Sequence, residues 1–169
     1  ENKLDLERSG VAGHLPGNKF RPDVGGDAYL QNAAAFYTLV FEVEASAGNH
    51  DIYYKQVNQD GTLRHVTPIP LATGSNNQSN PSIGSSNGPP GLSNRVLIAW
   101  QSTSTLSSGD EDLWGAYVEW NGNLLIPAFQ VTSNSRSQRH PSVSGVASIH
   151  GTQCQMVAFE DDWVSDNDI

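Results

Sequence analysis

A short pattern, proline followed by a polar, an aliphatic and a small residue, occurs three times along this chain. It begins at Pro22, Pro81 and Pro141, so the copies are 59 and 60 residues apart. A second pattern has the same spacing. It is an apolar run that ends in an aromatic residue followed by an acid or an amide. The aromatic residues are Phe41, Trp100 and Phe159, and we expect them at equivalent positions in the core. A fixed spacing of this kind predicts tandem structural repeats.

Each repeat has the local signals of short β-strands. The runs at 37–43 and 96–100 are β-branched and aromatic, are too short for typical helices and are bounded by Gly, Ser or Asn. Asp60-Gly61 and Asn121-Gly122 mark hairpin turns, which predicts strands over 51–57 with 62–69 and over 112–120 with 124–131. The one helix candidate, residues 27–36, we interpret as a loop insertion.

A four-stranded meander repeated in tandem is typical of a β-propeller, in which neighbouring blades cover each other's faces. We therefore predict an all-β fold: a partial β-propeller of tandem four-stranded antiparallel blades of about 59 residues. Two blades are complete and a third is partial. The predicted division is 1–21 for an outer strand and connector, 22–80 for blade 1, 81–140 for blade 2 and 141–169 for an incomplete blade 3.

Two or three blades are too few to close a propeller, which has roughly 4–8. We therefore expect this chain to self-associate or to be part of a larger ring. The alternative state, a free monomer, would expose blade faces and strand edges to water.

The order of the repeated patterns resembles that of TolB-type propeller repeats. The resemblance is carried by Pro141-Ser-Val-Ser-Gly, Met156-Val-Ala-Phe and Asn167-Asp-Ile, and earlier by Asp51-Ile-Tyr-Tyr and Val131-Thr. It covers the chain from Pro22 onward and implies a propeller fold of a kind found in periplasmic, surface and hydrolase-associated proteins. Asp23 departs from the pattern, because serine is usual at this place.

Charge and composition exclude several classes of protein. The net charge of −9 argues against binding to the phosphate backbone of nucleic acids. No run approaches 18 apolar residues, so we expect no membrane span. No leader sequence is visible, and we expect a mature secreted, periplasmic or cell-surface protein. Cys154 is the single cysteine, and its apolar surroundings predict a buried side chain.

The candidate ligand-binding residues lie at the starts of the first strands. First strands are innermost in a propeller, so Arg21, Asn80 and His140 are expected to meet around one channel. They are equivalent in place but different in chemistry, as a binding site would allow. The full candidate set is Arg21, Asp23, Asn80, Ser82, His140, Ser142 and, in a loop, Trp163. The alternative is that these side chains only solvate the channel wall.

Acidic loops raise the possibility of a calcium site, since Ca²⁺ takes six to eight oxygen ligands. The candidates are Asp110, Asp112, Asp161, Asp162, Asp166 and Asp168. The alternative is that the repeated aspartate is a turn former whose carboxylate accepts nearby backbone N–H groups. No other cofactor is expected.

No catalytic set emerges from the sequence. Gly84-Ser-Ser-Asn-Gly matches the nucleophile-elbow pattern in form, but Pro89-Pro90 follows and prevents the required helix. The sequence therefore favours a non-enzymatic binding or scaffold module of a secreted or surface propeller protein that contacts protein or glycan. The alternatives are the propeller region of a secreted hydrolase with its catalytic residues elsewhere, and a structural surface-layer or adhesin segment.

Overall fold

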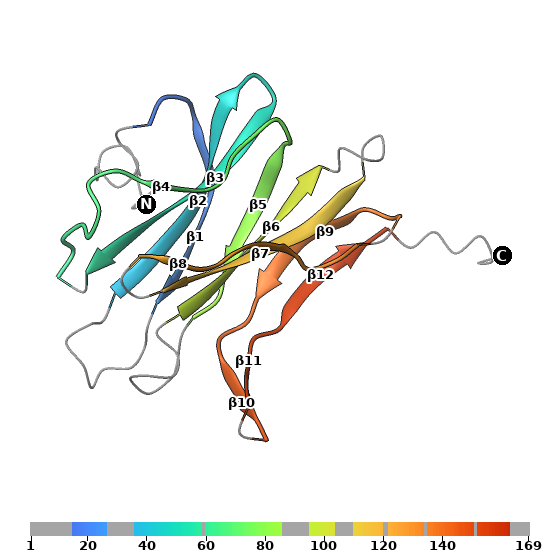
Figure 1. Ribbon diagram of the computed structural model, residues 1–169. Helices are drawn as coiled ribbons and strands as arrows, with labels where there is room; N and C mark the ends of the chain where they lie inside the picture. Colours follow the sequence, from blue (N-terminus) through green and yellow to red (C-terminus); the bar gives the residue numbers. More distant parts are fainter. Residues whose placement is uncertain are drawn as a thin grey trace, which may run out of the picture.

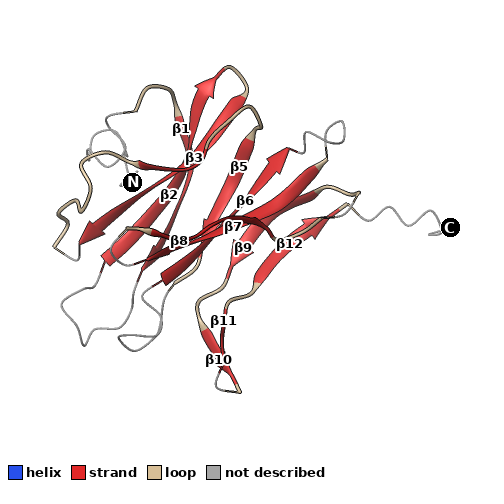
Figure 2. Cartoon of the chain, viewed as in Figure 1, coloured by secondary structure: helices blue, strands red, loops and turns tan. Residues whose placement is uncertain are grey.

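All regular structure in the described part of the chain is β-strand, which confirms the all-β prediction (Figure 2). The computed structural model describes residues 15–26, 36–58, 60–85, 95–103, 110–119, 122–133, 135–150 and 152–162. The region interpreted as a loop insertion, 27–36, lies outside these residues except for Phe36, which begins a strand. No helix of the described residues is long and apolar enough to cross a membrane.

Two antiparallel sheets of four strands follow each other along the chain, each with its strands in sequence order. The first, here called the first unit, contains β1 (Lys19–Gly26), β2 (Phe36–Ser46), β3 (Asn49–Asn58) and β4 (Ile69–Ala72). The second unit contains β5 (Gln78–Ile83), β6 (Arg95–Thr103), β7 (Glu111–Glu119) and β8 (Leu124–Gln130). Figure 1 shows the second unit between the first and the last strands of the chain.

A third unit pairs β9 (Gln138–Val143) with β12 (Val157–Asp161). Between them a hairpin of β10 (Ala147–Ile149) and β11 (Thr152–Cys154) projects away from the sheets (Figure 1). The prediction that Cys154 is buried is therefore wrong. The side chain is only half-buried, because this hairpin stands apart from the packed sheets and offers little cover.

The main apolar core lies between the first two units. Val40, Ile52 and Tyr54 of the first unit pack in one cluster with Ile98 and Trp100 of the second. The Tyr54 hydroxyl also donates to the Gly122 carbonyl oxygen at 2.8 Å, and burial raises the pKa of this phenol to about 12. The β-branched and aromatic runs thus form strands whose side chains fill the space between two sheets.

The aromatic positions at intervals of 59 residues differ in burial. Phe41 and Trp100 are 0% and 1% exposed, as expected of core residues, but Phe159 is 41% exposed. The prediction of a core position is wrong for Phe159. Within the described residues its sheet has only the strands β9 and β12, so fewer neighbouring side chains are available to cover the ring.

One predicted hairpin is shorter than the sequence indicates. The turn at Asp60-Gly61 forms, with the Gly61 N–H donating to the Asn58 carbonyl oxygen at 2.9 Å. Beyond the isolated bridge between Val57 and Leu63, however, the chain leaves the sheet and returns only as β4 at Ile69. Pro68 and Pro70 explain the short strand, since proline provides no N–H to the strand ladder. The other predicted hairpin, β7 with β8, is confirmed.

Candidate functional site at the starts of the first strands

The first strands of successive units lie next to each other, since β1 contacts β5 and β5 contacts β9. Near the start of each strand one residue has a positive φ: 44° at Arg21, 50° at Asn80 and 50° at His140. This left-handed backbone is uncommon for residues other than glycine. Each of these residues precedes the proline that begins the repeated pattern. The pattern therefore marks the same left-handed backbone conformation in all three units.

The left-handed residues coincide with irregularities in strand pairing. The register shifts between Phe20 and Asp23 in the first unit and between Ser79 and Ser82 in the second. It shifts in the third unit between Ala158 and Glu160 on the partner strand. A β-bulge redirects the side chain at the irregular position. The bulge therefore turns the side chain of each left-handed residue toward the neighbouring second strand.

Each left-handed residue hydrogen-bonds the acid or amide that follows the aromatic position in its own unit. The pairs are Arg21 with Glu42 (3.0 Å), Asn80 with Gln101 (2.6 Å) and His140 with Glu160 (2.9 Å). Sequence reasoning named the first member of each pair and missed the second. The signal was present, because an acid or amide stands at the same spacing of 59 residues.

The same acids and amides also join one unit to the next. Glu42 Oε1 accepts the backbone N–H of Asn80 at 2.7 Å. Gln101 Oε1 accepts the backbone N–H of His140 at 3.2 Å. We call Glu42, Gln101 and Glu160 the outer row. Its first two members have one role in common, which is to hold the next left-handed residue in place.

Asp23, Ser82 and Ser142 form a second line of equivalent positions, here called the inner row. Asp23 Oδ2 accepts both the Ile83 backbone N–H, at 2.9 Å, and the Ser82 hydroxyl, at 3.2 Å. Ser82 Oγ in turn accepts the Val143 backbone N–H at 3.2 Å. The inner row thus links the same units as the outer row, about two residues farther along the first strands.

Glycines allow the first strands to approach closely. A Cβ atom on Gly25 would lie 2.4 Å from the carbonyl oxygen of Gly84, and one on Gly84 would lie 2.4 Å from that of Ser144. Real Cβ atoms do not come this close to backbone oxygen. The glycine that ends the repeated pattern in the first two units is therefore required by contact with the following unit.

Glu42 is the most enclosed member of the site, with a fully buried side chain. Its carboxylate contacts the guanidinium of Arg21, whose side chain is 56% exposed, and His50 Nδ1 at 2.7 Å. The His50 ring stacks on Phe20 with a centroid distance of 5.2 Å. Two basic side chains and one backbone N–H therefore compensate the burial of this carboxylate.

A charged cluster centred on Arg139 lies in the third unit, next to the outer row. Its guanidinium pairs with Glu111 and, at 3.3 Å, with Asp162, and the hydrogen bond and charge of Glu111 raise the pKa of Arg139. Glu111 also accepts Gln101 Nε2 at 2.8 Å. The cluster connects the outer row to side chains exposed to solvent.

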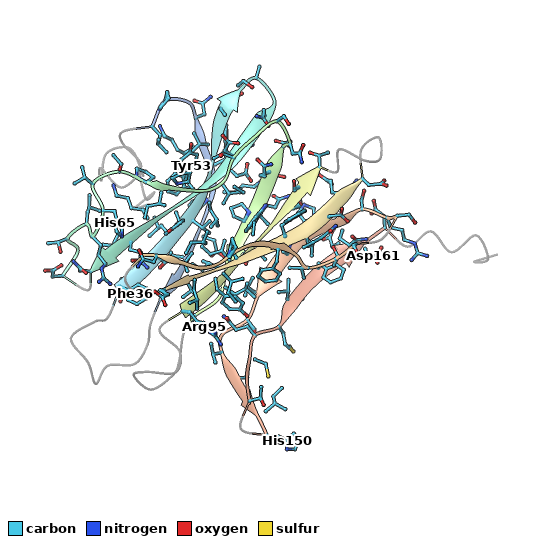
Figure 3. All side chains as sticks on the ribbon, in the orientation of Figure 1. Phe36, Tyr53, His65, Arg95, His150 and Asp161 are labelled. Atoms are coloured by element: carbon cyan, nitrogen blue, oxygen red, sulfur yellow. The ribbon has the colours of Figure 1, made fainter. Side chains whose placement is uncertain are left out.

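The predicted calcium ligands do not come together in the described part of the chain, where no group of three His, Cys, Asp or Glu side chains could hold a metal ion. Asp112 accepts Gln130 Nε2 at 3.0 Å, and burial raises the pKa of Asp112. Asp110 and Asp162 are also described, as is Asp161, which Figure 3 shows on the side of the third unit. Trp163, Asp166 and Asp168 lie outside the described residues.

The repeated aspartate of the predicted turns has a different role in the first unit. Asp51 lies within β3, and its carboxylate accepts the backbone N–H of Gly74, 23 residues away, at 3.1 Å. It therefore connects β3 to the segment after β4 and does not close a local turn.

Comparison of the chain with protein-family models, curated proteins and solved structures finds no significant match.

Replacing Asp23 with alanine is expected to lower the free energy of unfolding by about 1–3 kcal/mol, because the Ile83 N–H loses its acceptor between two units. Urea unfolding followed by tryptophan fluorescence measures this change. Ser142→Ala, compared in dilute protein where the chain is monomeric, is the matched control, since no hydrogen bond of its hydroxyl is found among the described residues. Equal effects of the two substitutions would contradict the assignment of the inner row.

Proposed function

We propose that this chain is a non-enzymatic binding or scaffold module, and that its units are blades of a TolB-type β-propeller of a secreted, periplasmic or cell-surface protein. The proposal is supported by two four-stranded meanders of identical strand order and by first strands that lie side by side. The outer and inner rows also support the proposal, because they join each unit to the next, as contacts between neighbouring repeats do in repeat proteins.

The observation that carries the binding proposal is the set of left-handed residues Arg21, Asn80 and His140 near the starts of the first strands, here called the rim. The same backbone presents a guanidinium at Arg21, an amide at Asn80 and an imidazole at His140. Arg21 and His140 keep 56% and 57% of their side chains exposed despite their hydrogen bonds. Such a rim suits a polar ligand with several hydrogen-bonding groups, either a glycan or an extended stretch of a partner protein.

Substitution of His140 with alanine tests the rim more directly than substitution of Arg21, which also contacts buried Glu42. Ligands are first identified by screening glycan and peptide arrays with the full chain, and affinities are then measured by calorimetry. His140→Ala is expected to weaken binding by about 1–3 kcal/mol, roughly 5- to 150-fold. The melting temperature should change little, because His140 and its partner Glu160 are 57% and 72% exposed.

His150→Ala is the matched control for this experiment. His150 lies at the tip of the β10–β11 hairpin, which projects away from the sheets (Figure 3), and it also has a positive φ, of 49°. We expect it to retain the native affinity. Arg21→Ala should also weaken binding, but it removes a partner of buried Glu42 and therefore changes stability as well. A ligand whose affinity is the same for native protein and both rim variants would exclude the rim as its site.

A further inference from the structure

The two rows have an open acceptor end in the third unit. Glu42 and Gln101 each accept a backbone N–H from the following unit. Glu160, the next member of the outer row, pairs with His140 and lies near the charge of Arg139, but it is 72% exposed and accepts no backbone N–H from another unit among the described residues. Ser142, the next member of the inner row, is also exposed. Two acceptors are thus placed for a following unit that the described residues do not contain.

The first unit has the matching donor end. Val24 is the counterpart of Ile83 and Val143, whose N–H groups are accepted by the inner row. The N–H of Val24 instead donates to the carboxylate of its own neighbour, Asp23, at 2.9 Å. Its side chain is 57% exposed, whereas that of Ile83 is 5% exposed and belongs to the core between the units. The first unit therefore exposes a surface that is covered in the second.

We propose that a second copy of this chain docks head to tail, with the third unit of one copy against β1 of the other. Glu160 and Ser142 of one copy accept the backbone N–H groups of Arg21 and Val24 of the other, and the side chain of Val24 becomes buried. The proposal rests on the proposed function, because it treats the units as blades that continue one pattern from copy to copy.

The partner is inferred to be a second copy because the first and third units are complementary in hydrogen-bonding groups and charge. The third unit offers acceptors and a negative charge at Glu160, and the first offers N–H donors and the positive charge of Arg21, whose side chain is 56% exposed although it pairs with Glu42. Figure 1 shows these units on opposite sides of the described chain, so one copy cannot join its own ends through these residues. The contact is therefore between different surfaces, as in head-to-tail assemblies, which form rings when the rotation between copies closes.

Sedimentation velocity of the full chain over a range of concentrations tests this association. The native chain is expected to form dimers or larger assemblies. Glu160→Ala and Val24→Asp should each raise the dissociation constant about tenfold, the effect of one lost hydrogen bond or more. Glu160→Gln is the matched control and should weaken association less than Glu160→Ala, because it loses the charge but keeps an acceptor oxygen, as Gln101 does in the second unit.

Mixing the two impaired variants distinguishes a head-to-tail contact from a symmetric one. Glu160→Ala keeps its donor end and Val24→Asp keeps its acceptor end, so the mixture should contain pairs with one intact contact and associate more strongly than either variant alone. A native chain that stays monomeric, or one whose association is unaffected by Glu160→Ala and Val24→Asp, would overturn the proposal. No ligand is present, so this failure would leave the binding prediction for His140 standing.

Discussion

Replacing Glu42 with alanine is expected to lower the free energy of unfolding by about 2–4 kcal/mol, because more than one partly buried donor would lose its acceptor. The carboxylate is fully buried, and its loss would leave the Arg21 guanidinium, His50 Nδ1 and the Asn80 N–H without their acceptor. Chemical denaturation monitored by tryptophan fluorescence and circular dichroism measures the difference from the native chain.

Two controls show whether the cost comes from the junction between units. Glu42→Gln keeps an acceptor oxygen for Asn80 and imitates the second unit, where Gln101 holds this place, so its cost should be clearly smaller. Glu160→Ala removes the equivalent carboxylate where it is exposed, and little change in unfolding free energy is expected in dilute protein, where the chain is monomeric. Similar losses for Glu42→Ala and Glu160→Ala would show that the buried contacts to the second unit are not the cause.

Replacing Trp100 with alanine is expected to cost about 3–5 kcal/mol of unfolding free energy, the usual range for deleting a buried large aromatic side chain. Trp100 is 1% exposed and packs in the cluster that joins the first two units. Its removal would leave a cavity between two sheets and weaken their contact. Thermal and urea unfolding, followed by circular dichroism, measure the loss.

Phe159→Ala is the matched substitution, because Phe159 lies 59 residues after Trp100 but is 41% exposed. We expect its cost to be well below that of Trp100→Ala, since an exposed ring loses less burial and leaves no closed cavity. A comparable loss at the two positions would contradict the observed difference in their packing.

The strands and the equivalence of positions were predictable because they depend on local chemistry. Short β-branched and aromatic runs bounded by turn residues favour strands in any context. Spacing alone aligned Arg21, Asn80 and His140, which have the same left-handed backbone in the structure. The local sequence also contained the reason why residues 62–69 do not form a full strand, namely Pro68 and Pro70. The prediction gave more weight to the turn before them.

The contacts of the candidate site were not predictable from spacing. Differences in side-chain chemistry at Arg21, Asn80 and His140 argued for ligand contact and against a packing role. The structure shows all three in hydrogen bonds, and those of Asn80 and His140 also join neighbouring units. Their acceptors lie 20 or 21 residues away or in another unit, and only a defined strand register and bulge bring such groups within hydrogen-bonding distance.

The sequence by itself determined an all-β chain, its strand-forming runs and the places that correspond between units. Only the tertiary structure decided how far equivalent residues are buried and which partners they contact. Glu42 is fully buried and Glu160 is 72% exposed, and Trp100 is enclosed where Phe159 is not. The physical reason is that strand formation follows from neighbouring residues along the chain, whereas burial and charge compensation depend on which unit packs against each face.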